Sequence, residues 1–151
     1  VSINTIALEN IDFITEASKI FGTQCIVVSI DVKKNAFGLY KVFNKKIGMT
    51  DFNPIDFAKK CEIAGAGEIL LTSVDNEGTQ RGYDIELIRY ISEQVNIPII
   101  ANGGSGEPMH CVEAIKNGAD AVAAAYIFHF SKYTPNMIKA EMNKNNINTR
   151  I

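Results

Sequence analysis

The chain has 151 residues, 46% of them hydrophobic, with a formal net charge of −2 and an isoelectric point near 5.7. That length and composition favour one globular domain with a sizeable core over a disordered or multi-domain chain. The near balance of charge argues against a general nucleic-acid-binding role. No apolar run reaches the length of a membrane span and no signal peptide opens the chain, so we expect a cytoplasmic protein without membrane or nucleic-acid partners.

Segments of strand length alternate along the chain with segments of helical period. The expected strands are residues 1–5, 25–30, 68–74, 97–102 and 120–128. The expected helices are residues 10–21, 53–66, 84–95, 107–118 and 134–145. This alternation is typical of βαβ units, and nearly continuous apolar strands imply a sheet whose outer face is covered. The sequence therefore predicts an α/β fold with parallel strands and helices on one face.

One connection breaks the alternation, after the second expected strand. Residues 36–49 carry Phe37, Leu39 and Phe43 in an alternating pattern that ends at a turn-forming Asn-Lys-Lys at 44–46. This pattern predicts a small β-hairpin inserted at the loop face. The alternative is a flexible insertion, because a two-stranded ribbon alone is only marginally stable.

The polar segments that follow the strands are where a ligand is expected, since ligands of α/β folds collect at the carboxyl ends of strands. The glycine-rich loop at 102–106 follows one strand and precedes a helix that begins near Pro108. Glycines let the backbone approach a ligand closely, and N–H groups at a helix start attract an anion such as phosphate. Gly78 and Thr79 form a second loop of this kind. Tight turns need glycine regardless, so a purely structural role stays open.

Carboxylates end two neighbouring strands, Asp31 after the second and Asp75 after the third. A carboxylate in this position can act as a general base. Three alternatives stay open for Asp31: a helix cap, a salt bridge to Lys33 or Lys34, and a shared divalent-metal site.

Thiols and imidazoles give little support for metal or disulfide chemistry. Cys25, Cys61 and Cys111 are widely spaced among apolar residues, where cysteine usually acts as a small buried side chain. His110 and His129 have no second candidate ligand three or four residues away. We expect neither a metal site nor a cofactor.

Four stretches, in this order and at these intervals, resemble the cyclase subunit of imidazole glycerol phosphate synthase: SIDVKKN, AGAGEILLTSVDNEGTQRGYD, IPIIANGGSG and GADAVAAAYIFHF. The similarity extends over nearly the whole chain. It implies a TIM (β/α)₈ barrel, of which residues 1–151 cover about the fourth to eighth strands as one partial-barrel domain with the hairpin inserted. The family's other catalytic aspartate and the glycine-rich loop after the third strand belong to the part of the barrel that these residues do not cover.

The same resemblance implies a lyase of histidine biosynthesis. A glutaminase partner supplies ammonia, which the cyclase condenses with a phosphorylated ribulosyl aminoimidazole carboxamide nucleotide to give imidazole glycerol phosphate and the carboxamide nucleotide. Asp31 is then one of two catalytic aspartates, and Asn4 and Thr5 help to hold one substrate phosphate. Thr72 lines the site between the phosphates. The residues expected around the second phosphate are Gly78, Gly103, Gly104, Ala125 and Tyr126. Asn102 is also expected among the residues that bind the substrate or its phosphates.

Some positions depart from the family pattern. Glu77 replaces the usual aspartate before Gly78, Asn102 replaces a small hydroxyl residue, and Tyr126 replaces a serine of the second phosphate site. Residues 32–42 are closer to a paralogous branch associated with surface-polysaccharide clusters. Members of that branch are thought to deliver ammonia, with a glutaminase partner, to a third protein that amidinates a sugar. An inactive fragment or a binding module is a third alternative.

A sheet that holds only part of the barrel has consequences for association. We expect unpaired edges at the first and last strands, together with an exposed barrel-lining face. The residues expected on that face are Ile26, Val28, Ile69, Leu71 and Ile99 or Ile100. Exposed edges and apolar patches favour pairing, so the partial barrel is expected to be stable only when covered, by the rest of the barrel or by self-association.

Overall fold

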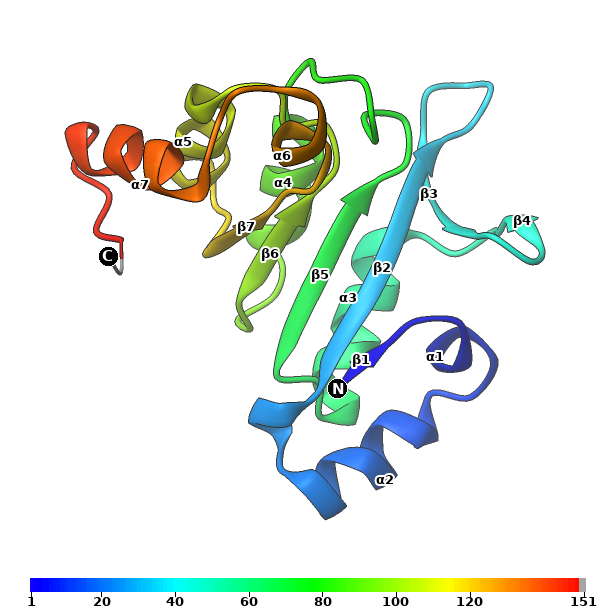
Figure 1. Ribbon diagram of the computed structural model, residues 1–151. Coiled ribbons are helices and arrows are strands. Elements are labelled where there is room, and N and C mark those ends of the chain that lie inside the picture. Colours follow the sequence, from blue (N-terminus) through cyan, green and yellow to red (C-terminus); the bar gives the residue numbers. More distant parts are fainter. Residues whose placement is uncertain (150–151) are drawn as a thin grey trace.

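The computed structural model describes residues 1–149. Its five parallel strands lie side by side in chain order (Figure 1): β1 (Ser2–Ile3), β2 (Val27–Lys34), β5 (Glu68–Ser73), β6 (Ile99–Asn102) and β7 (Ala121–Ala123). A strand order that never reverses belongs to a segment of a barrel, whereas a doubly wound sheet reverses at its switch point. The predicted α/β fold, part of a (β/α)₈ barrel, is therefore confirmed.

Helices lie between the parallel strands in the sequence, and two more follow the last strand; the main helical layer packs on one side of the sheet. They are α1 (Thr5–Glu9), α2 (Asp12–Phe21), α3 (Pro54–Ala64), α4 (Ile85–Ser92), α5 (Pro108–Lys116), α6 (Tyr126–Phe130) and α7 (Pro135–Lys144), with a 3₁₀ turn η1 (Thr23–Cys25) before β2. In that layer α3 contacts β2, α4 contacts β6 and α5 contacts β7. None of these helices is long and apolar enough to cross a membrane.

The boundaries of α3 show why these sequences form helices where they do. Asn53 precedes the helix, and its side-chain oxygen accepts hydrogen bonds from the N–H groups of Ile55 and Asp56, two of the donors that a helix start leaves unpaired. Pro54 occupies the first turn, where its missing N–H is not needed. Gly65 ends the helix in the left-handed conformation at φ 104°.

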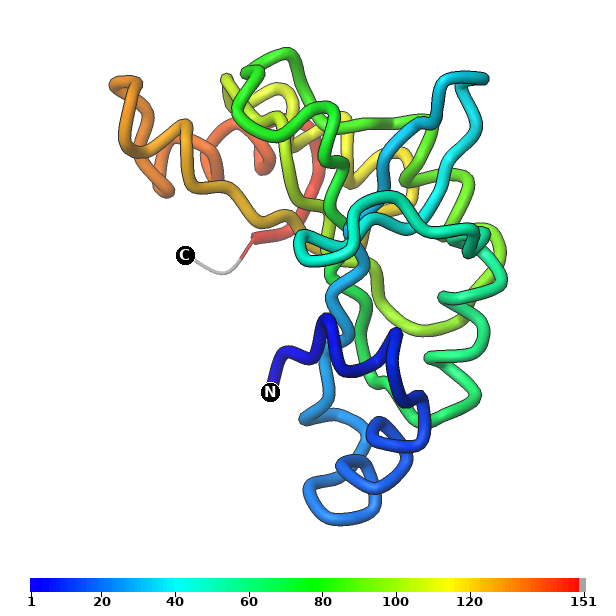
Figure 2. The backbone as a smooth tube through the Cα atoms, turned by 90° about the vertical axis from the view of Figure 1, so that its right-hand side faces the viewer, coloured from blue at the N-terminus to red at the C-terminus, as the bar shows by residue number. Residues whose placement is uncertain are grey.

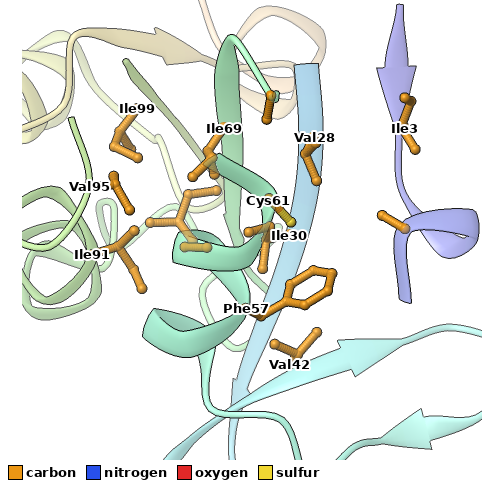
Figure 3. Close-up of a cluster of buried hydrophobic side chains, with 14 of the residues drawn as sticks. Ile3, Val28, Ile30, Val42, Phe57, Cys61, Ile69, Ile91, Val95 and Ile99 are labelled. Carbon is orange, nitrogen blue, oxygen red and sulfur yellow. The ribbon is translucent and has the colours of Figure 1, made fainter. Parts of the chain in front are cut away.

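The two faces of β2 differ in character because successive side chains of a strand point to opposite faces. Val28, Ile30 and Val32 are buried under the helices, while Ser29 and Asp31 are only half-buried on the other face. The buried set continues into β5 and β6 and packs against α3 and α4 (Figure 3). This is the main core of the protein, and a second core lies between α5, α7 and β7.

The prediction of the barrel-lining residues was wrong for Ile26, Val28, Ile69 and Leu71, and of the two alternatives Ile99 and Ile100 only Ile100 lies on the open face. The residues Ile26, Val28, Ile69, Leu71 and Ile99 are all buried on the helix-covered side. The sequence gives the two-residue period of a strand but not which of the two sets of alternating side chains faces the helices. The open face instead carries Leu70 and Ile100, together with polar side chains.

Several element boundaries also differ from expectation. β2 continues through Lys34, beyond the expected end at residue 30. Its polar second half stays in the sheet because it pairs with β3 of the inserted hairpin. Residues 1–5 form a strand only over Ser2–Ile3, and Thr5 begins α1. The aromatic run at 126–130 is helical because Ile127 turns into the second core. Cys25 lies in the turn before β2 and is exposed, whereas the other two cysteines are buried as expected.

The inserted segment is a hydrogen-bonded ribbon. β3 (Tyr40–Asn44) pairs antiparallel with the second half of β2 and then with β4 (Gly48–Met49). β3 pairs with the second half of β2 on the same edge where β1 pairs with its first half. The turn between β3 and β4 therefore lies on the side of α1 (Figure 2). The Tyr40 hydroxyl donates to an oxygen of Asp84 at 2.9 Å, which fastens the ribbon to the start of α4.

Candidate functional site

Three polar residues form one row across the open face of the sheet. Asp31 of β2 is the register partner of Thr72 in β5, which is in turn the partner of Asn102 in β6. Because paired positions point to the same face, all three side chains project to the side away from the helices. The row lies at the carboxyl end of the strands, where a barrel places its active site.

These residues surround a pocket of about 350 Å³. It is lined by Asn4, Ser29, Asp31, Phe43, Lys45, Leu70, Thr72, Val74, Glu77 and Asn102. Four of the predicted site residues therefore share one cavity, although they are up to 98 positions apart in the sequence, from Asn4 to Asn102. Thr5 is not among the lining residues, but it follows Asn4 directly and begins α1.

Asp31 is held by an amide and not by a cation. The Asn4 side-chain nitrogen donates to Asp31 Oδ2 at 3.4 Å. Of the two lysines considered as salt-bridge partners, Lys34 pairs with Glu86 at 2.9 Å, and Lys33 lies 5.6 Å from the centre of the Phe43 ring.

Within residues 1–149 Asp31 forms no ion pair. It also lies inside β2 and caps no helix. The two structural alternatives for Asp31 are thereby removed.

Thr72 and Asn102 are joined by a hydrogen bond in which the amide of Asn102 donates to Thr72 Oγ1 at 3.1 Å. The hydroxyl oxygen accepts this bond, so its own hydrogen is available to a ligand in the pocket. Asn102 thus orients Thr72.

Asp75 has a different role from Asp31. One of its oxygens accepts a hydrogen bond from the backbone N–H of Lys34 at 2.8 Å, which ties the loop after β5 to the end of β2. It does not line the pocket. Within the described part of the chain, no group of three or more His, Cys, Asp or Glu side chains is placed to hold a metal ion.

The predicted second phosphate loop owes its glycines at least partly to close packing. A Cβ on Gly104 would lie 2.1 Å from the carbonyl oxygen of Gly82, whose N–H donates to the Gly104 carbonyl at 2.8 Å. A Cβ on Gly103 would lie 2.8 Å from the Ser73 carbonyl and 3.2 Å from a carboxylate oxygen of Glu77. By contrast, no atom outside its immediate neighbours lies within 4 Å of such a Cβ at Gly78, where only the φ of +74° favours glycine.

The remaining residues predicted at that phosphate follow β7. Asn102 and Ala123 are register partners, so the loops that follow β6 and β7 leave the same end of the sheet. Ala125 precedes α6, and the ring of Tyr126 packs 4.3 Å from that of Phe130. Phosphate binding by these loops stays a prediction.

A buried hydroxyl and a buried thiol group pack against the backbone near these loops. The Tyr83 hydroxyl donates to the Ala123 carbonyl at 2.9 Å and lies 3.8 Å from the sulfur of Cys111. Burial raises the pKa of both side chains. Both therefore stay protonated near neutral pH and brace the loops without titrating there.

The pocket contains residues that the sequence did not single out. Ser29 lies two positions before Asp31, and the strand period alone predicts that both share a face. Phe43 and Lys45 enter from the hairpin, and Phe43 is the register partner of Asp31. No sequence signal fixes that register, so the hairpin's share of the site depended on the fold.

A larger cavity of about 580 Å³ lies elsewhere, between α5, β7 and α7. Its walls are mainly apolar and include Val122, Phe128, Ile138 and Met142. The carboxylate of Asp120 at this cavity accepts a hydrogen bond from the Ile99 N–H and so serves the backbone. The smaller pocket is the better candidate for chemistry because several polar side chains converge there.

Comparison with known proteins shows the family of this chain. Residues 1–134 match the family described as "Histidine biosynthesis protein". The chain belongs to this family. Its barrel fold accounts for the unreversed strand order and for the position of Asp31 at the carboxyl end of the sheet.

The similar relatives carry one kind of name. A protein of Campylobacter jejuni, named "Putative imidazole glycerol phosphate synthase subunit hisF2", is 48% identical over 153 residues, which cover 100% of this chain and 60% of that protein. "Imidazole glycerol phosphate synthase subunit HisF" of Methanococcus vannielii is 48% identical, with 100% and 64% covered. The subunit of the same name from Hydrogenobaculum sp. is 46% identical, with 100% and 61% covered. The chain spans about three fifths of the length of these relatives.

Proposed function

We propose that the protein containing this chain is the cyclase subunit of imidazole glycerol phosphate synthase. The observation that carries the proposal is the pocket in which Asp31, Asn4, Thr72 and Asn102 meet at the carboxyl end of a barrel sheet. Membership of the histidine biosynthesis family and the names of the relatives support it.

Asp31 is the acid/base group of the proposed reaction. Addition of ammonia to the ribulosyl carbonyl gives a carbinolamine, and its loss of water requires a proton on the departing hydroxyl. A carboxyl group that gives up and takes back a proton serves both this step and the later ring closure. Asn4 donates to Asp31 Oδ2 and so holds one carboxylate oxygen, which leaves the other oxygen for the substrate.

Thr72 and Asn4 position the substrate in this scheme. The Thr72 hydroxyl, oriented by Asn102, donates to an oxygen of the ribulosyl chain, and Asn4 with Thr5 contacts one phosphate. The second phosphate goes to the loops of Gly78, Gly103 and Gly104 with Ala125 and Tyr126. The Glu77 carboxylate beside Gly103 repels an anion, so phosphate binding there requires Glu77 to turn away.

A glutaminase is the proposed partner, and it docks at the opposite end of the barrel from the pocket. The last turns of α2 and α3 lead into the amino ends of β2 and β5 (Figure 1) and carry Ile20, Phe21 and Ile63 exposed to solvent. The Thr15 hydroxyl in the first turn of α2 donates to the Ala64 carbonyl at 3.0 Å, which joins α2 to the end of α3. Three exposed large apolar side chains at the ends of two packed helices support a protein interface at this end of the barrel.

The test is ammonia-dependent cyclisation of the phosphorylated ribulosyl nucleotide by the full-length gene product. Formation of imidazole glycerol phosphate is expected with ammonia alone, and with glutamine once the glutaminase is added. Ile63→Glu, at a position that is 86% exposed, is expected to impair only the glutamine-dependent rate. Phe37→Glu, an equally exposed change at the hairpin, is the matched control and leaves both rates unaltered. Absence of cyclisation with ammonia contradicts the proposal.

The second candidate is the paralogous subunit that delivers ammonia for amidination of a sugar. Residues 32–42 favour it, because their sequence is closer to that branch. In this structure they form the end of β2, a turn at 35–39 and the start of β3. In the turn, Asn35 Oδ1 accepts hydrogen bonds from the N–H groups of Phe37 and Leu39, and the side chain of Phe37 is exposed to solvent. Glutamine hydrolysis by the complex without consumption of the nucleotide decides for this second function.

A further inference from the structure

The charges around the Asp31 pocket are unequal. Two carboxylates, those of Asp31 and Glu77, line it. Among the lining residues in the described part of the chain, Lys45 is the one cation. A phosphorylated substrate brings at least one more negative charge, which two carboxylates alone oppose. The pocket can therefore attract an anion only through the positive charge of Lys45.

Lys45 is presented by a turn with a fixed conformation. Asn44, the residue before it, is only 2% exposed although it lies at the end of a hairpin strand. Its side-chain oxygen accepts hydrogen bonds from the N–H groups of Lys46 at 2.8 Å and Ile47 at 3.4 Å. An asparagine that satisfies the backbone of its own turn in this way fixes the turn. The position of Lys45 is thus set by the fold and is not a random state of a ribbon tip.

The turn is also joined to the predicted phosphate residues. The amide nitrogen of Asn44 donates to Thr5 Oγ1 at 3.4 Å, which connects the hairpin to the first residue of α1. Asn4, next to Thr5, lines the pocket together with Lys45. Lys45 forms no ion pair within residues 1–149, so its ammonium is available to a ligand.

We propose that Lys45 is a substrate-binding residue whose ammonium pairs with the substrate phosphate held at Asn4 and Thr5. The hairpin then acts as the wall that supplies positive charge to this end of the pocket. Only the identity of the reaction rests on the proposed cyclase function. The recognition of a phosphate ester by Lys45 stands on the pocket itself.

The binding test uses the full-length gene product and two probes, glycerol 3-phosphate and uncharged glycerol, with calorimetry or NMR titration. Lys45→Gln removes the charge and keeps most of the side-chain length, while Lys45→Arg keeps the charge. Lys46→Gln is the matched control, because Lys46 belongs to the same turn and does not line the pocket. Lys45→Gln is expected to weaken glycerol 3-phosphate binding about tenfold or more, the worth of one charge-assisted hydrogen bond. Lys45→Arg and Lys46→Gln retain the affinity, and glycerol binds none of the proteins measurably.

A second readout separates this inference from the proposed reaction. If the protein cyclises the nucleotide, Lys45→Gln is expected to raise KM about tenfold and to change kcat little, because the phosphate does not react. If cyclisation is absent but Lys45 still governs phosphate-ester binding, the proposed function fails and the inference stands. Equal affinity in Lys45→Gln and Lys46→Gln, or no binding of glycerol 3-phosphate by the unaltered protein at millimolar concentration, overturns the inference.

Discussion

The two faces of the sheet are made by the same strands and serve opposite purposes. In β2 and β5 the side chains under the helices are aliphatic and buried, while those between them on the open face include Ser29, Asp31 and Thr72. One face contributes stability through burial and the other presents polar groups to a ligand. Because buried and open positions alternate along each strand, substitutions at two neighbouring residues are expected to act differently: one on the core and the other on the site.

The largest effect on activity is expected from a substitution on the open face. Asp31→Asn in the full-length gene product removes the proposed acid/base group and is expected to lower the cyclisation rate about 10²–10⁴-fold. The amide has nearly the shape of the carboxylate, so Tm is expected to change little. Asp51→Asn, at an exposed bend, is the matched control with normal rate and Tm. Near-normal turnover by the Asp31 variant removes this residue from the mechanism.

Substitution of two neighbouring leucines tests which face of the sheet forms the core. Leu71, which is 2% exposed, lies in the core, and Leu70 borders the pocket. Leu71→Ala is expected to lower the free energy of unfolding by about 2–5 kcal/mol, and Leu70→Ala by clearly less because a cavity already adjoins it. Denaturant unfolding of the full-length variants measures both. Equal losses contradict the assignment of the two faces.

The open face also bears on association of residues 1–151. In the described structure β1 and β7 each pair with one parallel neighbour, and the open face carries Leu70 and Ile100. We expect this segment, expressed alone, to self-associate at low micromolar concentration, where sedimentation shows a mass about twofold or more above the monomer. A cooperative monomer indicates that the sheet is shielded in another way.

The smallest effect concerns the three cysteines. Burial raises the pKa of the Cys61 thiol to about 12 and raises that of Cys111, whereas Cys25 is exposed. Since the thiolate is the reactive form, one of these three thiols is expected to react quickly with a disulfide reagent at pH 8, and all three after unfolding. Cys25→Ser is expected to abolish the fast phase.

Because burial raises the pKa of Cys61 from its ordinary value of 9.0 to about 12, the folded protein keeps this thiol neutral at pH values where the unfolded chain ionises it. The resulting contribution to the free energy of unfolding is fully present below pH 9 and is lost as the pH rises toward 12. Chemical unfolding across that range checks the sign. A stability that rises with pH through this window contradicts it.

The sequence by itself determined the parallel α/β architecture, because alternating strand and helix periods allow few other folds. It also placed Asn4, Asp31, Thr72 and Asn102 in a candidate site, through the resemblance of their motifs and their positions after strands. The tertiary structure decided which phase of each strand faces the helices, since period two is compatible with either phase. It alone decided the register of β3 on β2, and with it the entry of Phe43 and Lys45 into the pocket. Strand pairing joins residues far apart in the chain, and no local pattern encodes which pairs meet.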